Sequence, residues 1–266
     1  MKIPLTWLYA PGDRPATVHK ALASDADIVI VDLEDAVSPG RKEYARDATA
    51  ELLSSPQRLP VHVRIDTPHD IEALAGLPGL TALRVPKVAY ATDIQQIAAR
   101  LPGVPLYPLL ESALAVEHAY AIATAHPAIE GIALGEADLR AELGLRGDTG
   151  LDWPRTRTVF AARAAGLGPP AQSVFPDICD LDALASSCAH GRDLGFLGRA
   201  AIHPRQLPVI ERAFLPSAEE IEEAEEIAKA AATDAGALAL PNGRFVDAAI
   251  VAAAQRTLAL ARREAT

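Results

Sequence analysis

The amino-acid sequence predicts a (β/α)8 TIM barrel with a C-terminal helical extension. Short apolar runs alternate with longer amphipathic segments rich in Ala and Leu through residues 1–216. Several runs, such as the DIVIVD of residues 27–32, are apolar without alternation, which is typical of parallel strands covered on both faces. There are eight such runs, and this number fits a closed barrel better than the alternative, an open doubly wound sheet.

The runs and the segments between them give the expected elements in chain order. The predicted strands are Trp7–Ala10, Ile28–Asp32, Val61–Ile65, Leu83–Lys87, Leu106–Glu111, Gly131–Gly135, Ser173–Asp177 and Phe196–His203. The predicted helices include Ala16–Ser24, Lys42–Ser54, Asp93–Arg100, Ala113–Ala125, Arg155–Ala165 and Leu181–Leu194. Residues 1–216 are therefore predicted to form the catalytic barrel domain.

Residues 217–266 have a different composition and are predicted to form a helical lid or oligomerisation segment. Ser217–Ala232 is rich in Glu and starts with SAEE, an N-cap followed by acidic residues that favour the positive end of a helix. A turn at Leu240–Gly243 precedes a final helix, Asp247–Arg263. This helix carries an apolar stripe that must be buried, and we expect a neighbouring subunit to cover it. The stripe comprises Val246, Ile250, Val251, Ala254 and Leu258.

The composition of the 266 residues limits the possible partners and compartments. A net charge of −10 disfavours nucleic acid and anionic membrane surfaces, which bind clustered Lys and Arg. The 2 cysteines, Cys179 and Cys188, lack the spacing of zinc ligands, so we expect a reducing compartment. The N-terminus does not have the pattern of a signal peptide, and no stretch reaches the roughly 18 apolar residues of a membrane helix. The expected location is the cytoplasm.

Ionisable residues follow nearly every predicted strand, at the barrel end where such folds place their chemistry. The carboxylates are Asp32, Glu34, Asp35, Glu111, Glu136, Asp138 and Asp177, and the cations are Arg14, Arg64 and Lys87, with His203 after the last strand. Clustered carboxylates raise one another's pKa unless a positive charge intervenes, so this acidic excess predicts a bound divalent cation. Oxygen ligands suit Mg2+ or Mn2+, and Glu111 and Asp138 are the favoured pair.

Three further features allow more than one interpretation. Arg64 could clamp a substrate carboxylate or form an internal ion pair with Asp32 or Glu34. Lys87 could form a Schiff base or an ion pair with a rim carboxylate. The PGDRP of residues 11–15 precedes a predicted helix start and suits a phosphate, although the pattern is unspecific.

Ten short motifs, in order along the chain, carry a resemblance to a known family. They are WLYAPGDRP, DIVIVDLEDAV followed by KEYAR, VRI, VPKV, PLLESALAV, ALGEADLRAELG, RTRTVFAARAAGL, VFPD, GRAAIHPRQLPVI and GRFVDAAIV. With these motifs the chain resembles the citrate lyase β-subunit-like branch of the HpcH/HpaI aldolase superfamily, the CoA-ester lyases. The resemblance implies a (β/α)8 barrel.

The resemblance also implies roles for particular residues. Glu111 and Asp138 would bind Mg2+, and Arg64 would hold the carboxylate of an oxaloacetate- or glyoxylate-like group. Arg14 and Lys20 would lie near the phosphates of CoA. The C-terminal segment would close over the site of a neighbouring subunit in a homotrimer, where Asp247 would be the acid/base group.

The sequence departs from the family pattern in three places. The loop after VRI is short, Ala89 replaces the usual glutamate after VPKV, and GEAD replaces the usual GAED, which displaces Glu136 by one position. The retained residues predict a Mg2+-dependent lyase that cleaves a 3-hydroxyacyl-CoA thioester, such as citryl-CoA or malyl-CoA, alone or within a citrate lyase complex. The alternatives are an aldolase that forms a Schiff base on Lys87 and a non-catalytic subunit that binds CoA or an acyl carrier.

Overall fold

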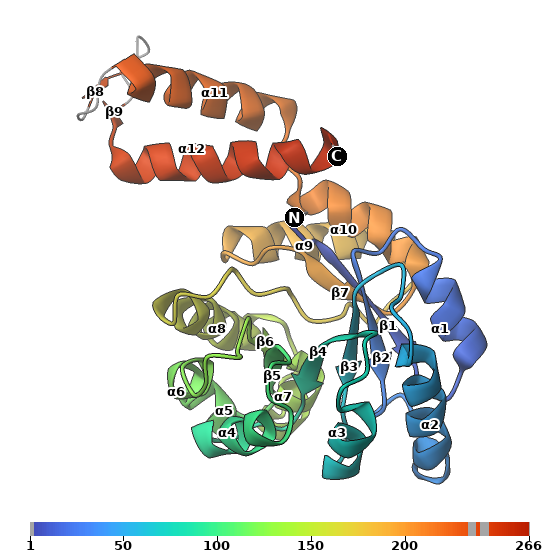
Figure 1. Ribbon diagram of the computed structural model, residues 1–266. Coiled ribbons are helices and arrows are strands. Elements are labelled where there is room, and N and C mark those ends of the chain that lie inside the picture. Colours follow the sequence, from blue (N-terminus) through green and yellow to red (C-terminus); the bar gives the residue numbers. More distant parts are fainter. Residues whose placement is uncertain (1–2, 234–237, 240–244, 266) are drawn as a thin grey trace. The chain divides into compact units, whose positions relative to one another are not determined.

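The computed structural model describes residues 3–233, 238–239 and 245–265. Its internal contacts divide the chain into two compact units (Figure 1). One unit is Pro4–Ala213, and the other combines Phe214–Thr266 with the first three residues. No helix within the described ranges is long and apolar enough to cross a membrane.

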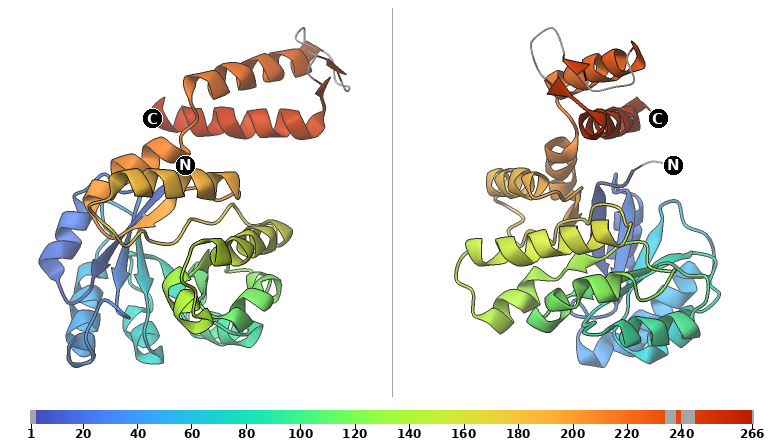
Figure 2. Two further views of the ribbon diagram at one scale, coloured as in Figure 1. Left: turned by 180° about the vertical axis from the view of Figure 1, so that it is seen from behind. Right: turned by 90° about the vertical axis from the view of Figure 1, so that its left-hand side faces the viewer.

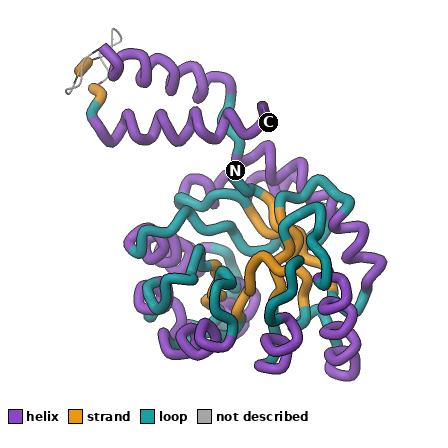
Figure 3. Tube along the Cα trace, in the orientation of Figure 1, coloured by secondary structure: helices purple, strands orange, loops and turns teal. Residues whose placement is uncertain are grey.

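A curled sheet of 7 parallel strands forms the centre of the larger unit, and its helices lie around the outside (Figure 3). The strand order is β6-β5-β4-β3-β2-β1-β7. The strands are β1 Thr6–Pro11, β2 Ile28–Asp32, β3 Val61–Arg64, β4 Leu80–Val85, β5 Leu106–Leu110, β6 Ala133–Leu134 and β7 Arg199–Ala201. All residues of β2 are buried, as the unbroken apolar run predicts for a strand covered on both faces.

All but the last helix of this unit lie between successive strands, and the last one follows the final strand of the sheet. They are α1 Pro15–Leu22, α2 Lys42–Leu53, α3 Pro68–Leu74, α4 Ala91–Arg100, α5 Ala113–Glu117, α6 Ala119–Ala123, α7 Glu136–Leu143, α8 Asp152–Ala164, α9 Leu181–Asp193 and α10 Leu207–Phe214. Local caps fix several starts: Ser112 accepts a hydrogen bond from the Ala115 N–H, and Asp180 accepts one from the Ala183 N–H. The predicted helix Ala113–Ala125 is two short helices separated at His118.

The predicted strand Ser173–Asp177 is not a strand in the described structure. The residue before this segment, Gln172, forms an isolated parallel bridge with Arg199. Pro176 lies within the segment and Pro170 lies shortly before it, and proline has no N–H for a ladder of hydrogen bonds. Side chains replace the ladder, because Ser173 donates to the Leu134 carbonyl of β6 and the Arg199 Nε donates to the Ser173 carbonyl at 2.9 Å. The sheet thus has 7 of the 8 strands of a complete barrel.

The C-terminal unit is a pair of helices, α11 Ala218–Thr233 and α12 Ala248–Ala261, with the short antiparallel strands β8 Leu238–Ala239 and β9 Phe245–Val246. Figure 2 shows the two helices side by side from two directions. Ala224 and Ile227 of α11 form a buried cluster with Val246 and Ala254, and the rest of the predicted apolar stripe packs against it. Within this chain α11 covers part of the stripe, while Ile250, Val251 and Leu258 stay partly exposed. Packing of this segment on a neighbouring subunit stays a prediction. The predicted turn Leu240–Gly243 lies outside the described residues.

Candidate active site

A cavity of about 650 Å³ opens at the carboxyl ends of the strands. Successive side chains of a strand point to opposite faces of the sheet, and the central strands β2, β3 and β4 each contribute one side chain, Asp32, Arg64 and Arg84, to the cavity. The residues of the predicted rim that line it are Asp32, Asp35, Arg64, Glu111, Glu136 and Asp138. The structure thus brings together most of the residues that the strand ends predicted.

Asp32 and Arg64 form a buried bidentate ion pair between β2 and β3. The Arg64 Nε and Nη2 donate to the two Asp32 oxygens at 2.7 and 2.6 Å. Burial opposes the charged form of Arg64, but the hydrogen bond with Asp32 and the nearby negative charges together outweigh it, so the pKa of the guanidinium is raised. The third nitrogen, Nη1, lies 3.1 Å from Glu34 and 3.4 Å from Asp35. The internal ion pair that the sequence allowed for Arg64 is therefore present, and it fixes the guanidinium at the cavity wall.

Glu111 is nearly buried, with 6% of its surface exposed, and two backbone elements position its carboxylate. The Lys87 N–H donates to Oε2 at 2.7 Å. Gly135 lies directly against the side chain, because a Cβ at that position would come within 2.9 Å of Oε1. Burial raises the pKa of Glu111 to about 7; the Lys87 hydrogen bond opposes this rise, and the nearby charges of Glu34 and Asp138 add to it. Such a carboxylate is prepared for a cation that would stabilise its charge.

Asp138 lies in the first turn of α7 and lines the same cavity as Glu111. The adjacent Glu136 accepts two hydrogen bonds from the buried Arg155 of α8, at 2.9 and 2.6 Å. This pair anchors the start of α7, and it gives the displaced glutamate of the GEAD motif a structural role.

The donor set at the cavity fits a magnesium-type ion in number and chemistry. No group of three or more His, Cys, Asp or Glu residues within the described part of the chain could enclose a metal ion. Mg2+ does not need such a cage, because it is commonly held by one or two carboxylates and keeps water or substrate oxygens elsewhere. Glu111 and Asp138 supply two carboxylates to one cavity, and the charge of Asp138 raises the pKa of Glu111.

Lys87 adopts the left-handed conformation with φ 54°, which is uncommon for a residue with a side chain. Its Nζ forms an ion pair with Glu34, and this hydrogen-bonded partner raises the pKa of the amine. A Schiff-base lysine must be neutral to attack a carbonyl, so this arrangement disfavours the aldolase alternative. The backbone N–H of Lys87 instead donates a hydrogen bond to the Glu111 carboxylate.

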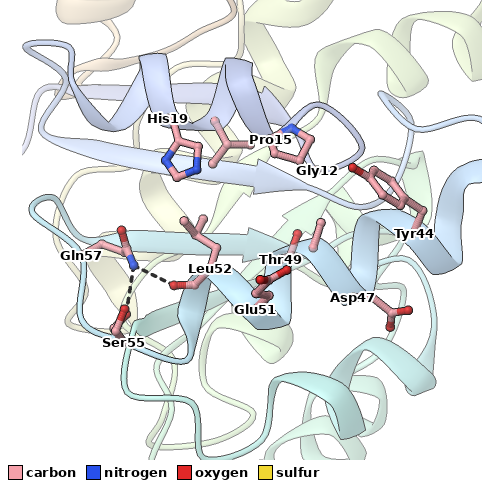
Figure 4. A pocket seen from close by; sticks show the side chains of 12 residues that line it. Gly12, Pro15, His19, Tyr44, Asp47, Thr49, Glu51, Leu52, Ser55 and Gln57 are labelled. Atoms are coloured by element: carbon pink, nitrogen blue, oxygen red, sulfur yellow. Dashed lines mark hydrogen bonds between the residues drawn. The ribbon is translucent and has the colours of Figure 1, made fainter.

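Arg14 and Lys20, predicted near CoA phosphates, lie on the surface beside and on α1. The Arg14 side chain is 68% exposed, Lys20 is exposed, and neither lines the cavity. A separate groove of about 600 Å³ lies between α1 and α2 (Figure 4). His19 and Leu52 line it, as does Gln57, whose amide donates to the Leu52 and Ser55 carbonyls. None of the predicted site residues lines this groove, so the cavity at the strand ends is the candidate active site.

Three other predicted residues accept hydrogen bonds from backbone N–H groups close to them in the sequence. Asp177 accepts hydrogen bonds from the N–H groups of Cys179 and Asp180, and His203 accepts one from the Arg205 N–H. Asp247 is the N-cap of α12, where its Oδ1 accepts bonds of 3.0 Å from the N–H groups of residues 249 and 250. The catalytic role expected of Asp247 in a neighbouring subunit stays a prediction.

Sequence reasoning missed four residues that shape the cavity or its loops. Tyr9 and Arg84 line the cavity from within strands, and Arg155 anchors Glu136. Lys42 donates to the Leu33 and Glu34 carbonyls at 2.8 and 2.7 Å, which holds the loop after β2. Strand parity, in addition to strand ends, would have indicated Arg84, since it lies opposite Arg64 in the register of β3 and β4.

Comparisons with known proteins identify the family of the chain. A model of the HpcH/HpaI aldolase/citrate lyase family matches residues 5–204. The chain is 37% identical to a (3S)-malyl-CoA thioesterase of Cereibacter sphaeroides, over 96% of this chain and 93% of that protein. It is 32% identical to a citrate lyase subunit beta-like protein of Mycobacterium tuberculosis, over 95% and 93%. The crystal structure of CitE from M. tuberculosis with magnesium, acetoacetate and coenzyme A matches with a TM-score of 0.83 and 31% identity, over 97% of this chain and 98% of that chain.

Proposed function

The chain belongs to the HpcH/HpaI aldolase/citrate lyase family, and we propose that it is a Mg2+-dependent lyase that breaks a carbon–carbon bond in a 3-hydroxyacyl-CoA thioester. Citryl-CoA and malyl-CoA are the substrates that we put forward. The observation that carries the proposal is the meeting of Glu111, Asp138 and Arg64 in one cavity at the strand ends. The similarity to a CitE structure that holds magnesium, acetoacetate and coenzyme A supports it.

Glu111 and Asp138 would hold the metal ion. When bound, Mg2+ supplies a Lewis acid that lowers the pKa of the substrate hydroxyl and stabilises the oxygen that becomes a carbonyl. The Lys87 N–H and the close packing of Gly135 keep the Glu111 carboxylate in one orientation before the ion arrives. This preorganisation reduces the rearrangement that the reaction requires.

Arg64 would orient the substrate carboxylate beside the reacting carbon. Its two hydrogen bonds with Asp32 fix the plane of the guanidinium, and its Nη1 is turned toward Glu34 and Asp35. A planar guanidinium binds a carboxylate with defined geometry, so it selects one substrate orientation. Because Asp32 is also bound by the backbone N–H groups of Glu34 and Ala36, the whole clamp is rigid.

The reaction also needs a base for the substrate hydroxyl and a site for CoA. A carboxylate base removes the hydroxyl proton, the C–C bond breaks, and the thioester enolate that leaves is protonated. We assign the base to Asp247 of a neighbouring copy in a homotrimer, with a carboxylate of the cavity as the alternative. Arg14 and Lys20 would meet the CoA phosphates. Mixed oligomers of Asp247→Asn and Arg64→Ala subunits should regain activity; verified hybrids without recovery would exclude the shared site.

The second candidate function is hydrolysis of the thioester, because one relative with 37% identity is named a (3S)-malyl-CoA thioesterase. Product analysis separates the two functions. The purified chain is incubated with citryl-CoA or malyl-CoA, with Mg2+ or with EDTA, and its products are separated by chromatography. A lyase yields a shorter acyl-CoA and a keto acid, whereas a thioesterase yields free CoA and the intact hydroxy acid. Activity of the isolated chain would also show that it works without the other subunits of a lyase complex.

A further inference from the structure

Arg84 is a buried cation in the wall of the catalytic cavity. It lies on β4, in register with Arg64 on β3 and with Tyr107 on β5. Only 4% of its surface is exposed, yet it lines the same cavity as Glu111 and Asp138. Its guanidinium carbon lies 5.2 Å from the centre of the Tyr107 ring.

This cation has no anionic partner among the described residues. No salt bridge joins Arg84 to a carboxylate there, and its buried Nε has no hydrogen-bond acceptor. The buried Arg155, by contrast, pairs with Glu136, and the buried Arg199 donates to Ser173 and Ser187. Burial lowers the pKa of Arg84, and the positive charge of Arg64 lowers it further. A buried charge without a partner is energetically unfavourable. A ligand that carries an anionic group would supply the missing partner.

The cavity has room for such a ligand. The walls contributed by β6, by the segment before Ser173 and by β7 each include a small side chain, namely Ala133, Ala171 and Ala200. Tyr9, Arg84 and Glu111 line this cavity together.

We propose that Arg84 is a specificity residue that binds a second carboxylate on the part of the substrate released as a keto acid. This inference rests on the proposed function: Glu111, Asp138 and Arg64 would hold the hydroxyl and the adjacent carboxylate, and Arg84 would bind the carboxylate one carbon further along. The favoured substrate class is then a hydroxyacyl thioester whose keto-acid half carries two carboxylates. In such a complex the guanidinium gains the charge-assisted hydrogen bonds that the protein does not provide.

A matched pair of ligands tests the assignment. Oxaloacetate differs from pyruvate only by the second carboxylate, and calorimetry with saturating Mg2+ gives the dissociation constant of each for the full-length protein. We expect the wild type to bind oxaloacetate at least about tenfold more tightly, since a hydrogen-bonded ion pair contributes about 1.5–3 kcal/mol. Arg84→Met should bring the ratio close to 1, while Arg84→Lys should keep part of the preference.

The control is Arg140→Met, because Arg140 also lines the cavity but pairs with the exposed Asp148 at 2.5 Å. This control should leave the ratio of the two dissociation constants unchanged. If Arg84→Met does not fold, the conservative variant Arg84→Lys is compared with the wild type instead. A wild type that binds both ligands equally, or an Arg84→Met variant that keeps the preference, overturns the inference. Failure of the proposed function would show in a different measurement. The wild type would then cleave no hydroxyacyl thioester, whatever the ratio of the two dissociation constants.

Discussion

The backbone N–H of Lys87 donates a 2.7 Å hydrogen bond to Glu111, and Lys87 adopts a left-handed backbone with φ 54° in the same turn. Left-handed backbone in a residue with a Cβ costs about 1–2 kcal/mol. Non-glycine residues in such conformations occur frequently at functional sites, where the surrounding structure enforces them. Here the unusual turn places a donor against the carboxylate that we propose as a metal ligand.

Glycine at position 87 should relieve this strain. Lys87→Ala and Lys87→Gly both remove the ion pair with Glu34, but only glycine adopts the left-handed conformation without a Cβ penalty. We expect the glycine variant to be about 1 kcal/mol more stable than the alanine variant, measured by chemical denaturation. Equal stability of the two variants would mean that the turn is not strained.

Magnesium affinity should depend on pH through Glu111, whose pKa is raised to about 7 by burial. A protonated carboxylate cannot bind the ion, so affinity should be highest above pH 7 and fall up to about tenfold per pH unit below it. In the metal-free protein the folded state binds more protons than the unfolded state between pH 4.5 and 7, so this group's contribution to stability increases as the pH falls through that window. Calorimetric titration of Mg2+ from pH 5.5 to 8 measures the first effect, and a flat affinity profile would contradict it.

A methyl group at Gly135 should disturb the site more than the fold. The added Cβ would meet the Glu111 side chain and force it out of its present position, so Gly135→Ala should lose at least about tenfold in Mg2+ affinity. Gly147→Ala is the matched control, because nothing lies within 4 Å of a Cβ at that position. Unchanged metal affinity in Gly135→Ala would show that Glu111 is not positioned by this contact.

Arg64→Lys keeps the positive charge but loses the planar guanidinium that pairs with Asp32. We expect kcat/KM to fall about 10- to 100-fold, which corresponds to the loss of a charged hydrogen bond of about 1.5–3 kcal/mol. Arg140→Lys, in the same cavity, should stay near the wild-type value. Wild-type kinetics for Arg64→Lys would leave Arg64 with a purely structural role.

The sequence was informative where a local pattern decides the outcome. The unbroken apolar run that ends at Asp32 and the run before Glu111 located both strands and the carboxylates at their ends. The capping box at Thr67 and Asp70 and the proline after Thr67 were equally local signals of α3, a helix that was not predicted. Parallel strands bring their ends together, so the site could be assembled from strand ends alone.

Contacts between segments that are distant in the sequence could not be predicted from local patterns. Glu136 was predicted as a rim carboxylate, but its pairing with Arg155 on another helix depends on how α7 and α8 pack. Arg84 lies inside a strand, and only the register with β3 and β5 shows that it faces the cavity. The apolar pattern of Val246 to Leu258 indicated a face that packs against another element, but it does not reveal that α11 covers part of it.

The measurement that tests the central claim most directly is product formation from citryl-CoA by the wild type and by Glu111→Gln and Asp138→Asn. The wild type with Mg2+ should form acetyl-CoA and a keto acid in equal amounts, and EDTA should abolish the reaction. Each variant should retain the fold and lose at least about 100-fold in kcat/KM, because one of the two metal ligands is gone. Cleavage that continues in EDTA or in both variants, or the release of free CoA with no keto acid, would contradict the account.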